Sequence, residues 1–373
     1  ITDDGTMDLT VTGNADFAGT SITLDDTLNF GSLTFNSAGA VVIAEDDATT
    51  VSGASTAGAG LTLVSADDVN LNNTVNVTGN TSVTAGTTTG GIDVNAKLTG
   101  SGTILLDAAD EITVDAAIDP TTVTLEADDD ITINAAVSAT TLITVSAGQD
   151  GTGSVEISAT GSLLADNVGN TADVTISTGV TTGAVTLTGT TTADDQVTVT
   201  SAAGSINGAG LVTAATVDLN ASTGIGDTTA LELAATSISA DTTSGNVDVD
   251  NTLPTVVNVS SLTTTGGSVR IDQSGGGDLT TAIVAATTSA TATNSAGAIA
   301  LDGSVNAASL VADASGSVTD GSDGDLSITA NASITGNAIT LGNDAGNGTD
   351  FGSLTFNSAG AVVIAEDTAT VLS

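Results

Sequence analysis

The chain has 373 residues, of which 44 are acidic and only Lys97 and Arg270 are basic, so its formal net charge is −42. Aromatic residues make up 1%, and cysteine and histidine are absent, which excludes disulfide bonds, thiolate metal sites and an aromatic core. The acidic balance also argues against nucleic acid and anionic lipid as partners, because both would be repelled.

The hydrophobic content of 40% and the positive mean hydropathy of +0.32 distinguish the chain from disordered acidic proteins. Its polar residues are mostly Thr, Ser, Asn and Gly, and β-branched threonine favours strands. No apolar run reaches the ~20 residues of a membrane-spanning helix, so no membrane insertion is expected. The sequence begins at Ile1 without signal-peptide features, and we expect any such peptide to have been removed or to lie outside this segment.

Short strands with apolar residues at alternate positions are predicted from the N-terminal part onward. Ile22, Val41 and Leu61 start three of them, at sequence offsets of 19 and then 20. The most regular part runs from residue 92 to 147, where two strands interleave on the same period. Their inward side chains are predicted to form two rows, one of Ile92, Ile112 and Ile131 and the other of Ile104, Val123 and Ile143.

Similar offsets continue further along the chain, namely 19 from Val155 to Val174 and 20 from Val197 to Val217. After about residue 200 the period loosens. Irregular coils or longer loops are expected near residues 204–210, 224–227 and 281–296, without a domain boundary.

A period of ~19–20 residues cannot close a globular core alone, but stacked units bury a continuous one. The sequence therefore predicts an all-β fold, a parallel β-helix (β-solenoid) with about 19–20 residues per coil in its regular part. We expect residues 1–373 to form a single continuous solenoid.

A second repeat is much longer. Residues 30–46 read FGSLTFNSAGAVVIAED, and residues 351–367 repeat all of them at an offset of 321. This match indicates one long unit of a tandem array followed by the start of the next. We expect such units to join end to end, as covalent copies or by head-to-tail stacking, into a polymer. At ~20 residues and ~4.8 Å per coil, its axial repeat would be about 77 Å.

Acidic residues recur just before the first strand of several coils. If they stack, neighbouring carboxylates lie ~4.8 Å apart and repel by about 0.9 kcal/mol in water. Ca²⁺ would relieve this repulsion through oxygen ligands, and a solvated edge neutralised by diffuse Na⁺ is the alternative. The candidate metal ligands are Asp67, Asp68, Asp110, Glu111, Asp129 and Asp130.

A further series follows each first strand, and its side chains are expected to hydrogen-bond from coil to coil. It consists of Asn72, Asn95, Asp115 and Asn134.

Enzymatic activity is not expected, because histidine and tyrosine are absent and the two basic residues lie ~9 coils apart at ~20 residues per coil. We assign no catalytic or cofactor-binding residue.

Residues 126–148, EADDDITINAAVSATTLITVSAG, and residues 171–189, TADVTISTGVTTGAVTLTG, resemble the β-helical shafts of filamentous haemagglutinin-type adhesins and related giant repeat proteins of bacterial surfaces. The resemblance implies a right-handed parallel β-helix, secretion across the envelope, and a structural or adhesive role.

The leading hypothesis is an extracellular structural protein that forms a filament, sheath or stalk at a prokaryotic cell surface. The alternatives are the shaft of a secreted adhesin whose binding tip lies outside this segment, and a calcium-dependent surface-layer component. The partners expected are other copies of the chain and surface polysaccharide.

Overall fold

The structure is a computed structural model that describes residues 1–3, 5, 6, 8–343 and 348–373. The chain divides into two compact units, unit 1 (Ile1–Asp195) and unit 2 (Gln196–Ser373). All regular structure in the described residues is β-strand. Accordingly, these residues include no helix that could cross a membrane.

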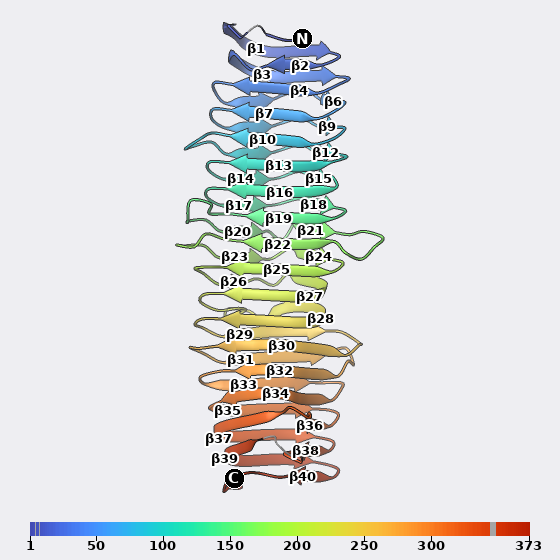
Figure 1. The fold of residues 1–373 in the computed structure, drawn as a ribbon, viewed down its shortest axis with the longest axis vertical. Coiled ribbons are helices and arrows are strands. Elements are labelled where there is room, and N and C mark those ends of the chain that lie inside the picture. The colour runs from blue at the N-terminus through green and yellow to red at the C-terminus, as the bar shows by residue number, and fades with distance from the viewer. Residues whose placement is uncertain (4, 7, 344–347) are drawn as a thin grey trace. The chain divides into compact units, whose positions relative to one another are not determined.

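Unit 1 is built from short strands that stack in parallel (Figure 1). They are β1 (Asp8–Gly19), β2 (Ile22–Leu24), β3 (Thr27–Ser37), β4 (Val41–Glu45), β5 (Thr49–Val51), β6 (Ser55–Ala57), β7 (Leu61–Ser65), β8 (Val69–Leu71), β9 (Val75–Val77), β10 (Thr81–Ala85), β11 (Ile92–Val94), β12 (Leu98–Gly100), β13 (Thr103–Ala108), β14 (Ile112–Val114), β15 (Ile118–Asp119), β16 (Thr122–Ala127), β17 (Ile131–Ile133), β18 (Ala136–Ala139), β19 (Leu142–Ser146), β20 (Val155–Ile157), β21 (Ser162–Ala165), β22 (Asp173–Ser177), β23 (Val185–Leu187) and β24 (Thr190–Ala193).

From β4 onward, each coil of unit 1 contributes one strand to each of three parallel sheets. One sheet follows the order β4, β7, β10, β13, β16, β19 and β22. A second follows β5, β8, β11, β14, β17, β20 and β23, and the third follows β6, β9, β12, β15, β18, β21 and β24. The arrangement is a β-solenoid with three short strands per coil.

Both predicted inward rows are confirmed. Ile112 pairs with Ile92 on one side and with Ile131 on the other, and Val123 pairs with Ile104 and Ile143 in the same way. All six side chains are at most 1% exposed. A slip of one residue would turn these side chains outward, so the alternation of apolar residues fixes the register.

The predicted equivalence of Val155 and Val174 is wrong. Val174 pairs with Ile143 in one sheet, whereas Val155 pairs with the more distant Val185 in another. Loops between the strands lengthen this coil, and Thr181 N donates to Gly151 O at 2.7 Å where two of the loops stack. Sequence spacing alone misaligns the strands here because these loops add residues without adding an apolar pair.

Unit 2 has fewer and longer strands per coil, again paired in parallel (Figure 1). They are β25 (Gln196–Ser201), β26 (Ile206–Asn207), β27 (Leu211–Ala221), β28 (Leu231–Thr242), β29 (Val247–Thr252), β30 (Val257–Thr264), β31 (Val269–Ser274), β32 (Leu279–Ala285), β33 (Ser289–Asn294), β34 (Ile299–Ala307), β35 (Ser309–Ala314), β36 (Val318–Asp320), β37 (Asp325–Gly336), β38 (Ile339–Leu341), β39 (Thr349–Ser358) and β40 (Val362–Ile364).

The period of unit 2 loosens as predicted. The sequence offset between paired residues is 18 for Leu231 and Val249 but 23 for Ile339 and Val362. The irregular coil expected at residues 281–296 is wrong for most of its length, because β32 and β33 occupy it and pair on both sides. Its alanine and threonine residues give a weak apolar signal, although Ala290 and Ala292 are buried.

The core of each unit is a narrow interior filled mainly by Val, Ile, Leu and Ala, as expected for a chain that is poor in aromatic residues. Both units are therefore parallel β-solenoids, and the predicted fold class is confirmed. That they form one continuous solenoid remains a prediction.

Candidate functional site

The predicted acidic edge lies in the turns before β8, β14 and β17. Asp129 N donates to Asp110 O at 3.2 Å, so these two turns stack directly. The turn of Asp67 and Asp68 is one coil further away, because Val69 N donates to Gly91 O and Ile92 N to Glu111 O. A glycine turn thus separates the first acidic pair from the other two.

Two of these carboxylates, those of Asp68 and Asp130, hydrogen-bond to the backbone of the next coil, and the same contact recurs elsewhere in the described residues. The side-chain oxygen of an Asp or Asn at or just before a strand accepts a hydrogen bond from the backbone N–H at the matching position of the following coil. The pairs are Asp68 with Gly91 (3.0 Å), Asp130 with Ser154 (2.7 Å), Asn246 with Ser268 (3.0 Å), Asp278 with Ala298 (2.8 Å) and Asp325 with Gly348 (2.7 Å). Two of the predicted metal ligands therefore have a structural role, which the sequence analysis missed.

The remaining carboxylates of this edge repel one another. Burial raises the pKa of Glu111, and the charges of Asp110 and Asp93 add to the rise. Burial likewise raises the pKa of Asp129, and the charges of Asp110 and Asp150 add to the rise. Proton uptake or cation binding would relieve this repulsion.

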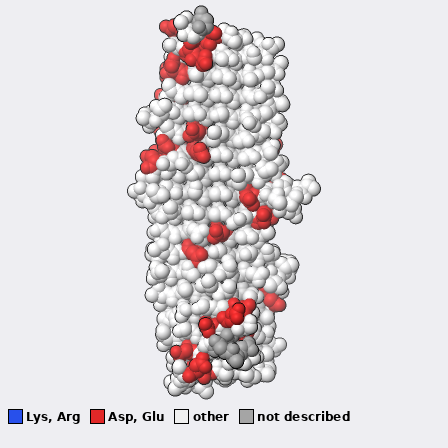
Figure 2. Space-filling model, in the orientation of Figure 1, with Lys and Arg blue, Asp and Glu red and all other residues white. Residues whose placement is uncertain are grey.

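Among the described residues, one group of three carboxylates is close enough to share a cation. Asp3, Asp25 and Asp26 each place a carboxylate oxygen within 4.8 Å of the others. The charge of Asp3, followed by burial, raises the pKa of Asp25. Burial acts to raise the pKa of Asp3 as well, but hydrogen bonds from the backbone of Asp26 and Asp25 outweigh it and lower that pKa. Figure 2 shows carboxylates gathered near β1 and β2, and others near β38 to β40.

Divalent cations are expected to stabilise the protein, because the net charge of −42 makes the folded chain repel itself. Thermal melts in EDTA and in excess Ca²⁺, at matched ionic strength, test this expectation. A higher midpoint in Ca²⁺ is the expected result. Identical midpoints would mean that diffuse screening accounts for all of the neutralisation.

The predicted series of polar residues after each first strand is confirmed for two pairs. Asn95 Nδ2 donates to Asn72 Oδ1 at 2.9 Å, and Asn134 Nδ2 donates to Asp115 Oδ1 at 2.8 Å. These exposed bonds tie successive coils together, so the role of the series is structural.

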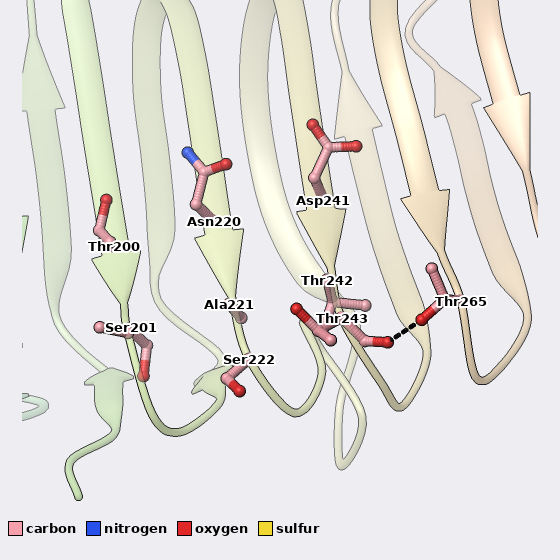
Figure 3. A pocket seen from close by; sticks show the side chains of 10 residues that line it. Thr200, Ser201, Asn220, Ala221, Ser222, Asp241, Thr242, Thr243 and Thr265 are labelled. Carbon is pink, nitrogen blue, oxygen red and sulfur yellow. Dashed lines mark hydrogen bonds between the residues drawn. The ribbon is translucent and has the colours of Figure 1, made fainter. Parts of the chain in front are cut away.

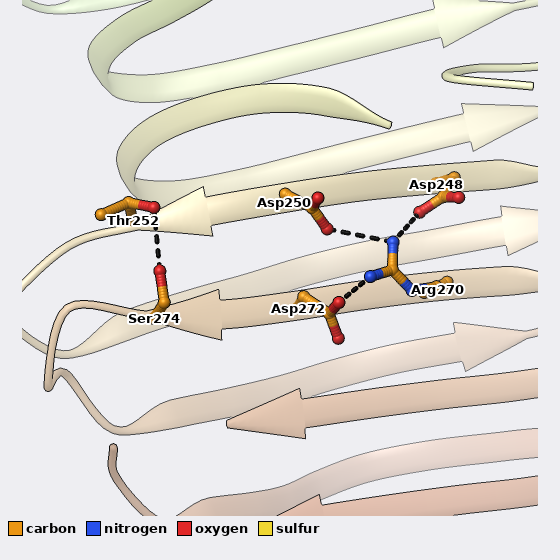
Figure 4. Close-up of polar contacts among 6 residues, drawn as sticks. All are labelled: Asp248, Asp250, Thr252, Arg270, Asp272 and Ser274. Carbon is orange, nitrogen blue, oxygen red and sulfur yellow. Dashed lines mark hydrogen bonds and ion pairs between the residues drawn. The ribbon is translucent and has the colours of Figure 1, made fainter. Parts of the chain in front are cut away.

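The single arginine sits among three aspartates in unit 2. Arg270 on β31 lies opposite Asp248 on β29, and next to this pair Asp250 lies opposite Asp272. The guanidinium contacts Asp248 and Asp272 and donates to Asp250 at 3.0 Å (Figure 4). Its single positive charge offsets part of the repulsion among the three carboxylates that the adjacent strands bring together.

Arg270→Gln is therefore expected to lower the free energy of unfolding by about 1–2 kcal/mol at low salt, a figure reduced for partial solvent exposure. Urea unfolding at low and high salt measures it, and added salt should shrink the loss. Lys97→Gln is the matched control, since the 3.9 Å contact of Lys97 with Asp119 is exposed and worth less than about 0.5 kcal/mol. Equal losses for the two variants would contradict this role for Arg270.

A glutamate with the same hydrogen bond recurs in the long repeat, buried in the first copy and half-buried in the second. Glu45 is 3% exposed, and its Oε1 accepts a hydrogen bond from Phe30 N at 2.7 Å. Its Oε2 accepts one from the Thr49 hydroxyl at 2.8 Å. In the second copy, Glu366 Oε1 accepts a hydrogen bond from Phe351 N at 2.6 Å. In both copies the glutamate side chain thus accepts a hydrogen bond from the same backbone N–H, that of Phe30 or Phe351.

Burial raises the pKa of Glu45 above its ordinary value of 4.5, partly offset by the bonds from Thr49 and Phe30. An acid with a raised pKa contributes stability that is present below the unfolded pKa and is lost as the pH rises through the folded pKa. Glu45→Gln keeps the shape without the charge. Its stability relative to the unsubstituted protein should increase from about pH 4 to about pH 8 in urea unfolding. Glu156→Gln, at an exposed position, is the control, and parallel pH profiles for all three proteins would contradict the expectation.

A shallow groove of about 370 Å³ lies where four strands of unit 2 end (Figure 3). Hydroxyl, amide and small apolar groups line it, together with the carboxylate of Asp241. That carboxylate is already engaged, because it accepts hydrogen bonds from Ser239, Ser261 and Thr263. The remaining polar groups of the groove are mainly hydroxyls, beside a larger apolar lining.

The long repeat also preserves a hydrogen-bond network across three coils. Asn14 Oδ1 accepts bonds from Ser32 at 3.0 Å, Thr34 at 3.2 Å and Ser52 at 2.9 Å. In the second copy, Asn331 Oδ1 accepts equivalent bonds from Ser353 (3.0 Å), Thr355 (3.3 Å) and Ser373 (3.1 Å). The likeness extends upstream of the identical segment, where residues 14–24 (NADFAGTSITL) correspond to residues 331–341 (NASITGNAITL). Both sequence copies therefore build the same local structure.

Comparisons of the chain with protein-family models, with curated proteins and with solved structures found no match.

Proposed function

We propose that the chain is a structural β-solenoid that forms a filament, sheath or stalk on the outside of a prokaryotic cell. The observation that carries this proposal is the long repeat with its repeated contacts. Asn14 and Asn331 each hold hydroxyl groups of the two following coils, and Phe30 and Phe351 each bond to the glutamate of the next turn.

A repeat of this kind extends a scaffold. Each coil buries its apolar row against its neighbours, so adding coils adds length and stability without a new core. The side chains that a pocket-based enzyme would need are scarce in this composition, which has two basic residues and no histidine. The polar contacts described above run mainly from coil to coil, which suits a scaffold that must hold its coils together.

An acidic exterior also suits an external material. A net charge of −42 keeps separate molecules soluble, and cations outside the cell would permit their close approach by screening that charge. Two basic residues leave few sites for trypsin-like proteases.

Assembly is tested with the full chain by sedimentation and electron microscopy over a range of protein and Ca²⁺ concentrations. Fibres with an axial repeat of about 77 Å, as ~16 coils of ~4.8 Å give, are the expected result. Immunogold labelling of intact source cells should place the protein outside the envelope. A monodisperse monomer under all these conditions would overturn the filament, and the shaft of an adhesin would then become the better hypothesis.

A further inference from the structure

One strand edge in unit 2 exposes apolar side chains whose equivalents in the first copy of the repeat are buried. β39 and β40 pair with β37 and β38 on one side, and we call their opposite side the forward edge, with residues 371–373 lying along it. Leu354 forms a bridge with Leu372 there, and Ser373 N donates to Leu354 O at 3.0 Å. Beside these contacts, Phe356 is 44% exposed and Leu372 is 71% exposed.

The first copy of the repeat places the same residues in the same register. Leu33, equivalent to Leu354, pairs with Val51, equivalent to Leu372, and Ser52 N donates to Leu33 O at 3.0 Å. Yet Phe35, equivalent to Phe356, is 0% exposed, and so is Val51. Because residues 30–46 and 351–367 are identical, the difference in exposure between Phe35 and Phe356 reflects what lies next to the segment.

In the first copy the neighbour is known. β7 pairs with β4, placing Leu61 on Val41 and Leu63 on Ile43. β8 pairs with β5, placing Leu71 on Val51. β6 pairs with β3 beside Phe35, whose N–H donates to the Ser55 hydroxyl at 3.2 Å. Residues 55–71 thus cover in unit 1 the surface that the forward edge presents in unit 2.

We propose that the forward edge of β39 and β40 is a docking surface for a second copy of the segment 53–77. Strand addition would supply partners for the open backbone groups of β40, and the leucines of the segment would cover Val362, Ile364 and Leu372. The shared register argues for this segment in particular, because the surface beneath it includes the identical residues 30–46 and 351–367 and the same asparagine network in both copies. The inference rests on the proposed function and deepens it, since it names the segment through which successive repeats meet.

The test uses the full chain and a synthetic peptide of residues 53–85 as the probe. Hydrogen exchange is followed at residues 354–364. At a peptide concentration of about ten times Kd, exchange there should slow about tenfold. A peptide carrying Leu61→Asp and Leu63→Asp should leave exchange unchanged, because it cannot bury charges against the edge.

Two variants of the chain test whether the peptide binds at the forward edge. Leu372→Asp should abolish the protection, whereas Val311→Asp, which changes a half-exposed valine on β35, should not. A second arm appends residues 53–85 after Ser373, so that the segment needs no separate association. Protection of the appended residues, and of residues 354–364, would support the docking surface even if the free peptide binds too weakly.

The inference is overturned if neither arm slows exchange, or if the charged peptide protects as well as the native one. Failure of this inference can be told apart from failure of the proposed function. If fibres form but neither experiment shows protection, the filament proposal is kept and the docking surface is rejected. Protection without fibres would establish the docking surface and count against the filament.

Discussion

Replacing Phe35 by alanine is expected to lower the free energy of unfolding by about 3–5 kcal/mol, the usual cost of removing a fully buried aromatic side chain. Phe35 lies on β3 with no exposed surface and pairs with Phe17 of the preceding coil. The loss combines the transfer of the ring to water with the cavity it leaves, and a narrow interior held by strands on all sides has little room to close that cavity.

Phe356→Ala is the matched control, because Phe356 and Phe35 occupy the same position of an identical seventeen-residue segment. Phe356 is 44% exposed, so its loss should cost less than half as much. Since the two residues lie in different units, local free energies from native-state hydrogen exchange on β3 and β39 are the appropriate measurement. Equal costs in dilute monomer would contradict the exposure difference. Equal costs only at concentrations where the protein assembles would instead show that assembly covers Phe356.

The regular coils could be predicted because two signals agree there. Ile92, Ile112 and Ile131 repeat at a near-constant offset, and each begins an apolar–polar–apolar triplet that fixes which side chains point inward. Where loops intervene, as between Val155 and its partner Val185, the offset grows well beyond the regular period and no local signal records the insertion. In unit 2 the inward positions of β33 are two alanines and Asn294, and their burial depends on neighbours that the sequence alone does not place.

The side-chain contacts were less predictable than the coils. The turns of Asp68 and Glu111 could be recognised as acidic, but the role of Asp68 depends on which N–H stacks above it, here that of Gly91. The glycine that interrupts the acidic row is visible in the sequence once the coils are aligned. By contrast, the network of Asn14 joins residues 18, 20 and 38 positions away. Such a network becomes visible only when three coils are superposed.

Asn251→Leu is expected to lower the free energy of unfolding by about 2–5 kcal/mol, although it preserves the side-chain volume. The reason is that it leaves buried polar groups without their hydrogen-bond partners. Asn251 is 0% exposed and Gln273, opposite it on β31, is 1% exposed. Asn251 Oδ1 accepts a hydrogen bond from Ala235 N at 2.9 Å, and its Nδ2 donates to Gln273 Oε1 at 2.7 Å. Leucine would leave the buried N–H of Ala235 and the buried amide oxygen of Gln273 without these partners.

Thr252→Val, on the same strand, is the control, since it removes only the exposed 2.9 Å contact with Ser274 and should cost less than about 1 kcal/mol. The double variant Asn251→Leu with Gln273→Leu separates the pair from its surroundings. Because it removes both partners of the 2.7 Å bond, its cost should fall short of the sum of the two single costs by about 0.5–3 kcal/mol. Strictly additive costs, measured by urea unfolding, would show that the two amides act independently. Retention of full stability by Asn251→Leu would show that the interior at this position tolerates unpaired polar groups, and would contradict a stabilising role for the Asn251–Gln273 hydrogen bond.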